Sequence, residues 1–218
     1  MARIQLVVLR GSVPEGSVYD LPPGLTSVGT QGELAIPGDP LLDPKHATLD
    51  RSPETLDLVG IPGSSGVFRR LREPGLIRSG DVVFVGEQYL LVRRGDDAPA
   101  EPLPAGRPLP PETFGTPLAP LRLQVTQLLA GGLPGRVVST EKEMVTVGRE
   151  GCDLSFPQDR YMSGRHVRFE LAASGHIQVI DLGSLNGTFI RVEQVPTRLH
   201  KGDEVQLGTM LFRIEIGN

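Results

Sequence analysis

Apolar and polar residues alternate along several short segments of the chain. The run LRLQVTQ, residues 121–127, alternates Leu121, Leu123 and Val125 with polar or charged side chains. The runs HVRFEL, HIQVID and FRIEI, which begin at residues 166, 176 and 212, continue this alternation. Gly, Asn, Asp and Ser clusters separate them at intervals of about 8 to 12 residues. The pattern predicts half-buried strands in an antiparallel β-sandwich whose loops carry the function.

The composition agrees with an all-β chain. There are 27 Gly, 20 Pro and no Trp among 218 residues, with 39% apolar and 22% charged side chains. Frequent Gly and Pro favour turns and short strands over helices. The length suits two domains of about 100 residues, each large enough to bury its own core.

A proline-rich segment divides the chain. Residues 96–120 contain 8 Pro in 25 positions, and they lack an alternating apolar pattern. Proline removes the N–H groups that a helix or a central strand needs. We therefore predict a semi-extended linker between a domain at residues 1–95 and a second domain at residues 121–218.

The two flanking segments repeat each other. The matched pairs are Gly29 with Gly148, His46 with His166, Gly66 with Gly187, and Gly80–Asp81 with Gly202–Asp203. The spacing between partners drifts only from 119 to 122 residues, which indicates one architecture with single-residue changes in its loops. Two copies are too few for a stacked solenoid, so each copy is expected to be a domain of its own.

Charge and cysteine content exclude several classes of function. Residues 1–95 hold 10 basic and 11 acidic side chains, and residues 120–218 hold 11 of each, so neither half has the basic excess of a nucleic-acid binder. The single Cys152 fits a reducing compartment. The apolar run near the start is too short for a membrane span. We expect a cytoplasmic protein without membrane or nucleic-acid partners.

Three loop motifs occur in order in the second copy. They are VGRE at residues 147–150, SGRH at residues 163–166 and DLGSLNGTF at residues 181–189. With the downstream GDEVQLG, they resemble the forkhead-associated (FHA) domain, a reader of phosphothreonine peptides. The resemblance covers nearly all of residues 121–216. It implies two FHA-like antiparallel β-sandwiches joined by the linker.

The resemblance also assigns candidate roles, and the chemistry of a phosphate supports them. A phosphothreonine carries roughly −1.5 to −2 charges and three strong acceptor oxygens. Arg149 offers a charged donor fork, Ser163 a short hydroxyl donor, and Arg165 a second cation. Asn186 suits recognition of the peptide main chain. At Leu185 the family often has Thr or Ser, which adds a phosphate hydrogen bond, so affinity or specificity is expected to differ.

Four further residues are expected to support the loops rather than touch the ligand. They are Gly148, His166, Asp181 and Gly187. In the family the histidine usually bonds across the base of the loop, while glycine permits positive φ and aspartate shapes turns. No spacing of His, Cys or carboxylates indicates a metal site, and no cofactor is implied.

The first copy lacks these chemical groups. Thr30 follows Gly29 where the second copy has Arg149, Asp43 stands in the place of Ser163, and Ser65 in the place of Asn186, while Lys45 matches Arg165. A carboxylate about 4 Å from a phosphate costs on the order of 4 kcal/mol per phosphate charge at an effective dielectric near 20. The first domain is therefore expected to be a degenerate FHA-like module with a phospho-independent contact or a spacer role.

The leading interpretation is a bacterial signalling adaptor that binds a threonine-phosphorylated protein in a Ser/Thr kinase pathway. An enzyme is disfavoured, since Ser163 and His166 lie in one short loop without a nucleophile elbow. A structural module that assembles independently of phosphate is the alternative, and the sequence leaves it open.

Overall fold

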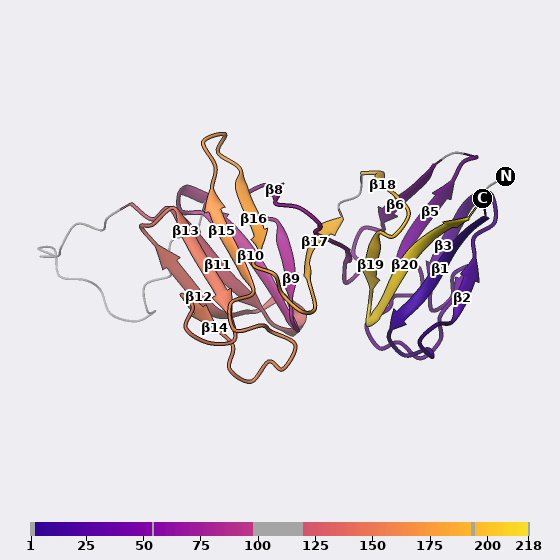
Figure 1. Cartoon of the computed structure of the whole chain (residues 1–218), viewed down its shortest axis with the longest axis horizontal. Helices are drawn as coiled ribbons and strands as arrows, with labels where there is room; N and C mark the ends of the chain where they lie inside the picture. The colour runs from indigo at the N-terminus through magenta and orange to yellow at the C-terminus, as the bar shows by residue number, and fades with distance from the viewer. Residues whose placement is uncertain (1–2, 54, 98–119, 193–194, 218) are drawn as a thin grey trace, which may run out of the picture. The chain divides into compact units, whose positions relative to one another are not determined.

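The fold is known from a computed structural model that describes residues 3–53, 55–97, 120–192 and 195–217 (Figure 1). The chain forms two compact units. The first unit comprises residues 1–72 and 189–218, and the second unit comprises residues 73–188. The described residues contain no α-helix, only the short 3-10 helices η1 (Gly95–Asp97) and η2 (Ala130–Gly132). The prediction of an all-β fold of sandwich type is confirmed.

The first unit is built from two sheets. One has the order β18-β6-β5-β3-β4, and the strands of the other that lie in this unit have the order β7-β19-β20-β1-β2. Among the described residues of this unit, only β3 and β4 pair in parallel. The strands are β1 (Arg3–Arg10), β2 (Val18–Asp20), β3 (Gly24–Gly29), β4 (Leu34–Ala35), β5 (Ala47–Arg51), β6 (Leu56–Gly60), β7 (Val67–Arg70), β18 (Thr197–Leu199), β19 (Glu204–Leu207) and β20 (Met210–Gly217). Strand β17 (Thr188–Val192) pairs with β7.

The second unit repeats this plan. One sheet has the order β14-β13-β15-β16-β8, and the strands of the other have the order β12-β11-β10-β9. Here β13 and β14 form the parallel pair. The strands are β8 (Gly75–Ile77), β9 (Val82–Val85), β10 (Gln88–Arg94), β11 (Leu123–Leu128), β12 (Pro134–Thr140), β13 (Met144–Gly148), β14 (Leu154–Ser155), β15 (Val167–Leu171) and β16 (Ile177–Asp181).

The units do not coincide with the two segments expected from the sequence. We call residues 1–95 the first repeat and residues 121–218 the second repeat. Strands β8, β9 and β10 belong to the first repeat but complete the second unit, and β18, β19 and β20 of the second repeat complete the first unit. The repeats thus exchange their last strands. Residues 98–119, most of the predicted linker, lie outside the described residues.

The exchange has a simple physical basis, because the last strands of the two repeats are equivalent. In the first unit Arg198 is paired with Asp57, and Leu199 with Leu56. At the corresponding place in the second unit, β8 pairs antiparallel with β16 in the same register. Strands β6 and β16 therefore offer the same register and similar apolar positions to an incoming strand, and each can pair with the last strands of either repeat.

Each core consequently contains side chains from both repeats. In the first unit Leu6 and Leu58 belong to one buried cluster with Phe212 and Ile214. In the same unit the ring of Tyr19 meets that of Phe212 edge to face, with their centroids 6.3 Å apart. Burial of apolar side chains supplies most of the favourable free energy of folding. Because each core needs apolar side chains from both repeats, neither core is complete within one repeat.

The alternating runs at residues 121–127, 166–171, 176–181 and 212–216 were expected to form strands, and they lie largely within β11, β15, β16 and β20. Strand β11 differs in its burial, because its polar residues Gln124 and Thr126 are buried too, at 7% and 8% exposed, beside the fully buried Leu123 and Val125. The strand is an inner strand of its sheet and pairs with β10 on one side and with β12 on the other. The side-chain amide of Gln124 donates to the hydroxyl of Ser139 at 3.1 Å, which satisfies part of its buried polar surface.

Candidate functional site

Three loops of the second unit, together with the last residues of the strands before two of them, Gly148 of β13 and Asp181 of β16, carry all the predicted site residues. They span residues 149–153 after β13, residues 157–166 before β15, and residues 182–187 after β16, and we call them the loop cluster. Gly148 allows the first two loops to meet. A Cβ atom at this position would lie 2.2 Å from the carbonyl oxygen of Gly164, which leaves no space for a side chain.

The main chain fixes Arg149 beside Ser163. The N–H of Arg149 donates to the carbonyl oxygen of Ser163 at 2.8 Å, and the N–H of Glu150 donates to that of Gly164 at 3.3 Å. These bonds join residues that are 14 apart in the sequence. The charged fork and the hydroxyl therefore start from adjacent points of rigid backbone.

Two guanidinium groups in the cluster are available for a ligand. Arg149 and Arg165 are both exposed. Within the described ranges, neither side chain forms a hydrogen bond or an ion pair. By contrast, Arg122, which directly precedes β11, forms an ion pair with Glu143. An exposed, unpaired arginine keeps all its donors free for an anion.

The hydroxyl of Ser163 is held in place as an acceptor. Its oxygen accepts the N–H of Leu185 at 3.1 Å, so the hydroxyl proton is left to donate elsewhere. The side chain of Leu185 itself is 86% exposed. The third loop thus fixes the serine of the second loop and presents a large apolar group next to it.

His166 ties the base of the cluster together. The ring is fully buried, its Nδ1 accepts the N–H of Ser163 at 3.1 Å, and its Nε2 donates to the carbonyl oxygen of Gly187 at 3.0 Å. Burial lowers the pKa of this imidazole, and the neutral form has the donor and acceptor that both bonds require. Neither ring nitrogen is directed at the Ser163 hydroxyl, so the two residues do not form a nucleophile and base pair.

Asp181 shapes the third loop. Its carboxylate accepts the N–H groups of Gly183 and Ser184 at 2.9 and 2.7 Å, and the hydroxyls of Ser184 and Thr188 at 2.7 and 2.6 Å. Burial alone would raise the pKa of this carboxyl, but the hydrogen bonds from Thr188 and Ser184 outweigh it and lower the pKa below its ordinary value. The ionised carboxylate holds the loop in one conformation.

Asn186 and Gly187 complete the same loop. The Asn186 side-chain amide donates to the carbonyl oxygen of Tyr161 at 2.8 Å, which links the second and third loops. Its amide oxygen and second N–H are left for a peptide main chain. Gly187 has a φ of +83°, which favours glycine, and its N–H donates to the Ser184 hydroxyl at 2.9 Å.

Together these residues offer two free cations and a positioned hydroxyl to an anion with several acceptor oxygens. No metal centre is evident in the part of the chain that the structure describes, since it contains no group of three or more His, Cys, Asp or Glu side chains able to hold an ion. Cys152 is only half-buried, and burial raises the pKa of its thiol, which disfavours the reactive thiolate.

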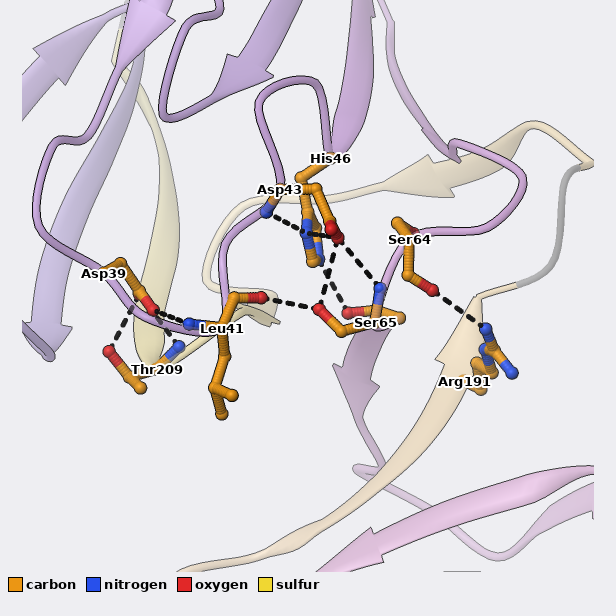
Figure 2. A network of polar contacts seen from close by, with 9 residues as sticks. Asp39, Leu41, Asp43, His46, Ser64, Ser65, Arg191 and Thr209 are labelled. Carbon is orange, nitrogen blue, oxygen red and sulfur yellow. Dashed lines mark hydrogen bonds and ion pairs between the residues drawn. The ribbon is translucent and has the colours of Figure 1, made fainter. Parts of the chain in front are cut away.

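The equivalent loops of the first unit are arranged differently (Figure 2). Asp43 turns inward. Its Oδ2 accepts the N–H of Ser65 at 2.9 Å and lies 3.3 Å from the Ser65 hydroxyl oxygen. The same oxygen lies 3.0 Å from Nδ1 of the buried His46. Burial opposes ionisation of Asp43, but these partners lower the pKa of its carboxyl. A carboxylate with internal donors thus occupies the place that Ser163 has in the second unit.

Ser65 partly replaces the asparagine of the other unit. Its hydroxyl donates to the carbonyl oxygen of Leu41 at 2.5 Å, as the Asn186 amide donates to Tyr161. His46 Nε2 meets the carbonyl oxygen of Gly66 at 2.9 Å, which matches the bond from His166 to Gly187. The loop framework is retained, while the positions equivalent to Arg149 and Ser163 carry Thr30 and Asp43.

Sequence reasoning did not identify Asp159 as part of the site. This carboxylate is 4% exposed and accepts the N–H of Tyr161 at 2.9 Å, within the loop that leads to Ser163. In the first unit Asp39 accepts the N–H of Leu41 at 2.9 Å in the same way (Figure 2). The two aspartates stand 120 residues apart, like the two histidines, so the repeat spacing contained the signal.

Comparison with known proteins gives a family match in the second repeat. Residues 145–208 match the FHA domain family. A stretch of 69 residues is 41% identical to the glycogen accumulation regulator GarA of Mycolicibacterium smegmatis, covering 31% of this chain and 43% of the relative. The oxoglutarate dehydrogenase inhibitor of Corynebacterium efficiens is 36% identical over 69 residues, covering 31% and 48%. The chain thus spans less than half the length of these curated relatives, which are bacterial and are named as a regulator and an inhibitor.

Among solved structures, the chain is similar to the FHA domain of the CT664 protein from Chlamydia trachomatis, with 23% sequence identity and a TM-score of 0.25. The match covers 37% of this chain and 85% of that domain's chain. It is also similar to EmbR of Mycobacterium tuberculosis in complex with a low-affinity phosphopeptide, with 21% identity, 41% and 23% covered, and a TM-score of 0.25. The described residues include no helix that is long and apolar enough to cross a membrane. The family match identifies an FHA domain at residues 145–208.

Proposed function

We propose that the chain is a non-catalytic signalling adaptor that binds threonine-phosphorylated proteins through the loop cluster of the second unit. In this proposal Arg149, Ser163 and Arg165 hold the phosphate, and Asn186 holds the peptide main chain. Gly148, His166, Asp181 and Gly187 support these residues from beneath. The adaptor acts in a Ser/Thr kinase pathway, and we place it in the cytoplasm.

One observation carries the proposal: the unpaired guanidinium of Arg149 starts from backbone that is bonded directly to Ser163. A phosphate dianion needs such a fork together with a short hydroxyl donor, because both must reach oxygens of one small group. The FHA match at residues 145–208 supports this assignment.

The first unit has a different function in this proposal. It is a degenerate FHA-like module, and the chain is a tandem arrangement of the two. The Asp43 carboxylate already accepts the N–H of Ser65 and repels a phosphate. Thr30 supplies no cation in place of Arg149. Contacts of the first unit are therefore independent of phosphorylation.

Titration calorimetry with paired peptides tests the function. A phosphothreonine peptide library identifies a ligand, and the selected peptide is compared with its unphosphorylated form on the full chain and on Arg149→Ala. We expect binding of the phosphorylated form only, and loss of most of that affinity in the variant. Equal binding of both forms would leave the alternative, a structural module that assembles without phosphate.

A further inference from the structure

The exchange of strands gives the first repeat a direct connection to the phosphopeptide site. Strand β8 of the first repeat pairs with β16, which ends at Asp181, the residue that shapes the third loop. Strand β10 pairs with β11 over six residue pairs. Val83 and Leu90, on β9 and β10, are fully buried. The second unit therefore takes one of its inner strands and part of its core from the first repeat.

A second contact reaches the loop that carries Ser163. The turn between β9 and β10 lies against the buried carboxylate of Asp159. The N–H of Glu87 and the side-chain amide of Gln88 both donate to Asp159 Oδ2, each at 2.8 Å. Asp159 Oδ1 in turn accepts the N–H of Tyr161, two residues before Ser163. Two donors from the first repeat thus fix one end of the second loop.

Gly86 shows how close this contact is. Its φ is +62°, and a Cβ atom there would lie 2.7 Å from Asp159 Oδ2. The corresponding turn of the second repeat makes the corresponding contact in the first unit. Gly208 has a φ of +58°, with Asp39 Oδ1 at 2.9 Å from its Cβ position, and the N–H and hydroxyl of Thr209 donate to Asp39.

From these contacts we propose that the first repeat supplies an essential part of the phosphopeptide reader. Its segment Gly75–Arg94 completes the sheets of the second unit, and its turn at Gly86 and Glu87 positions the Ser163 loop through Asp159. The first repeat thereby contributes to phosphopeptide binding without touching the peptide. This inference rests on the function proposed above.

One ion pair favours the exchanged connection over a contiguous one. Arg198 and Asp57 are paired across β18 and β6, and their side chains form two hydrogen bonds of 2.6 and 3.3 Å. At the equivalent place in the second unit, Leu76 stands opposite Gln178. If each repeat kept its own strands, Asp57 would face Leu76 and Arg198 would face Gln178, so the ion pair would be lost.

A crossed pair of glycine substitutions tests the proposal in the full chain. Gly86→Ala lies in the first repeat but places a methyl group against Asp159, so it should weaken phosphopeptide binding by about tenfold. Gly208→Ala lies in the repeat that carries Arg149, yet it contacts Asp39 and should leave the affinity unchanged. Each introduces similar backbone strain, so global destabilisation alone would not separate them. Retained affinity in Gly86→Ala together with weakened binding in Gly208→Ala would overturn the proposal, and so would equal effects of both.

A gentler pair of variants covers the case in which Gly86→Ala fails to fold. Gln88→Met removes one donor to Asp159 and introduces the residue found at the equivalent position, Met210. Thr209→Val removes the hydroxyl bond to Asp39. Weaker phosphopeptide binding is expected for Gln88→Met only. Wild-type affinity in Gln88→Met would contradict a positioning function for this turn.

Disulfide trapping tests the strand exchange without any phosphopeptide. In a Cys152→Ser background, paired substitutions Asp57→Cys and Arg198→Cys should form an intrachain disulfide, because paired Cα atoms of antiparallel strands lie about 4.5 to 5.5 Å apart. The matched pair Gln178→Cys and Arg198→Cys should not. A disulfide in the second pair, or a covalent dimer in the first, would overturn the assignment. If wild-type protein bound no phosphopeptide, this result would still stand.

Discussion

The main-chain N–H of Arg149 donates a hydrogen bond of 2.8 Å to the carbonyl oxygen of Ser163. This bond brings together two residues that the sequence separates by a turn, a short strand and a long loop. It means that the cation and the hydroxyl of the proposed site share one backbone support. Substitution of Arg149 is therefore expected to change the affinity for the phosphopeptide, and substitution of Gly148, which lets the two loops meet, is expected to change stability.

Removal of the Arg149 guanidinium should weaken phosphopeptide binding by about 10- to 100-fold, because hydrogen bonds to charged groups contribute about 1.5 to 3 kcal/mol. Calorimetric titration of Arg149→Ala measures the effect. Arg122→Ala is a suitable control, since its guanidinium is exposed but pairs with Glu143 outside the loop cluster. Similar affinities in wild type and Arg149→Ala would exclude the proposed phosphate site.

The close approach of two loops makes Gly148 sensitive to substitution. Gly148→Ala would place Cβ 2.2 Å from the Gly164 carbonyl oxygen, and steric strain of this kind costs about 1 to 3 kcal/mol. We expect a lower urea midpoint by circular dichroism. Gly164→Ala provides the control within the same contact, because no atom lies within 4 Å of its Cβ position. Equal midpoints for the two variants would show that the loops separate easily.

The buried histidine predicts a pH dependence of stability. Burial lowers the pKa of His166 in the folded protein below its ordinary value of about 6.5. Above that value both states are neutral, and the stability is unaffected. As the pH falls below about 6.5, the unfolded chain takes up the proton more readily than the folded protein does. The free energy of unfolding therefore decreases until the pH passes the lower pKa of the folded state.

Differential scanning calorimetry between pH 7.5 and 5 should therefore show a falling midpoint temperature. His166→Gln, which lacks the titrating ring, should show a shallower fall over the same range. The lowered pKa values of Asp43 and Asp181 act in the same direction but at lower pH, below about 4. An identical slope in the variant would mean that other groups control the effect.

Restoring the missing chemistry should convert the first unit into a second binding site. The combined changes Thr30→Arg and Asp43→Ser supply a cation and a hydroxyl on a framework that still has His46 in place. In an Arg149→Ala background, where the second unit binds poorly, we expect phosphopeptide binding to reappear with one peptide per chain. The single variant Asp43→Ser, which lacks the cation, is the control and should remain inactive.

A folded double variant that fails to bind would show that more than these two side chains distinguishes the units. Asp43→Ser should also lower stability by about 1 to 3 kcal/mol, because the Ser65 N–H loses its carboxylate partner. Thermal unfolding of the single variant checks this cost independently of any ligand.

The local secondary structure was predicted well from the sequence. Alternation located strands such as Val167–Leu171, and Gly–Arg, Ser–x–x–His and Asn–Gly motifs located the three loops, because turn residues and strand periodicity act over a few positions. The prediction that Asp43 stands in the place of Ser163 follows from the repeat spacing. The hydrogen bonding of Asp43 with Ser65 could not be predicted in this way, because it depends on how two loops far apart in the sequence meet.

The strand exchange could not be predicted for a related reason. Both repeats have buried apolar residues at equivalent positions of these strands, Val83 and Val85 in one and Val205 and Leu207 in the other, so these positions do not show which core each strand enters. The choice depends on a few cross-strand pairs, such as Arg198 with Asp57. Asp159 escaped notice because a single buried carboxylate has no local sequence signature.

The pairing of β1 with β20 also affects how the protein folds during synthesis. These strands pair Ile4 with Ile216 and Leu6 with Ile214, so β1 cannot form these pairs until residues 214–216 have left the ribosome. Contacts between residues so far apart in sequence slow folding, because a very large loop must close before they form. The second unit, whose segments are all translated by residue 188, can assemble before the first. The unit proposed to bind phosphothreonine would then fold before the first unit.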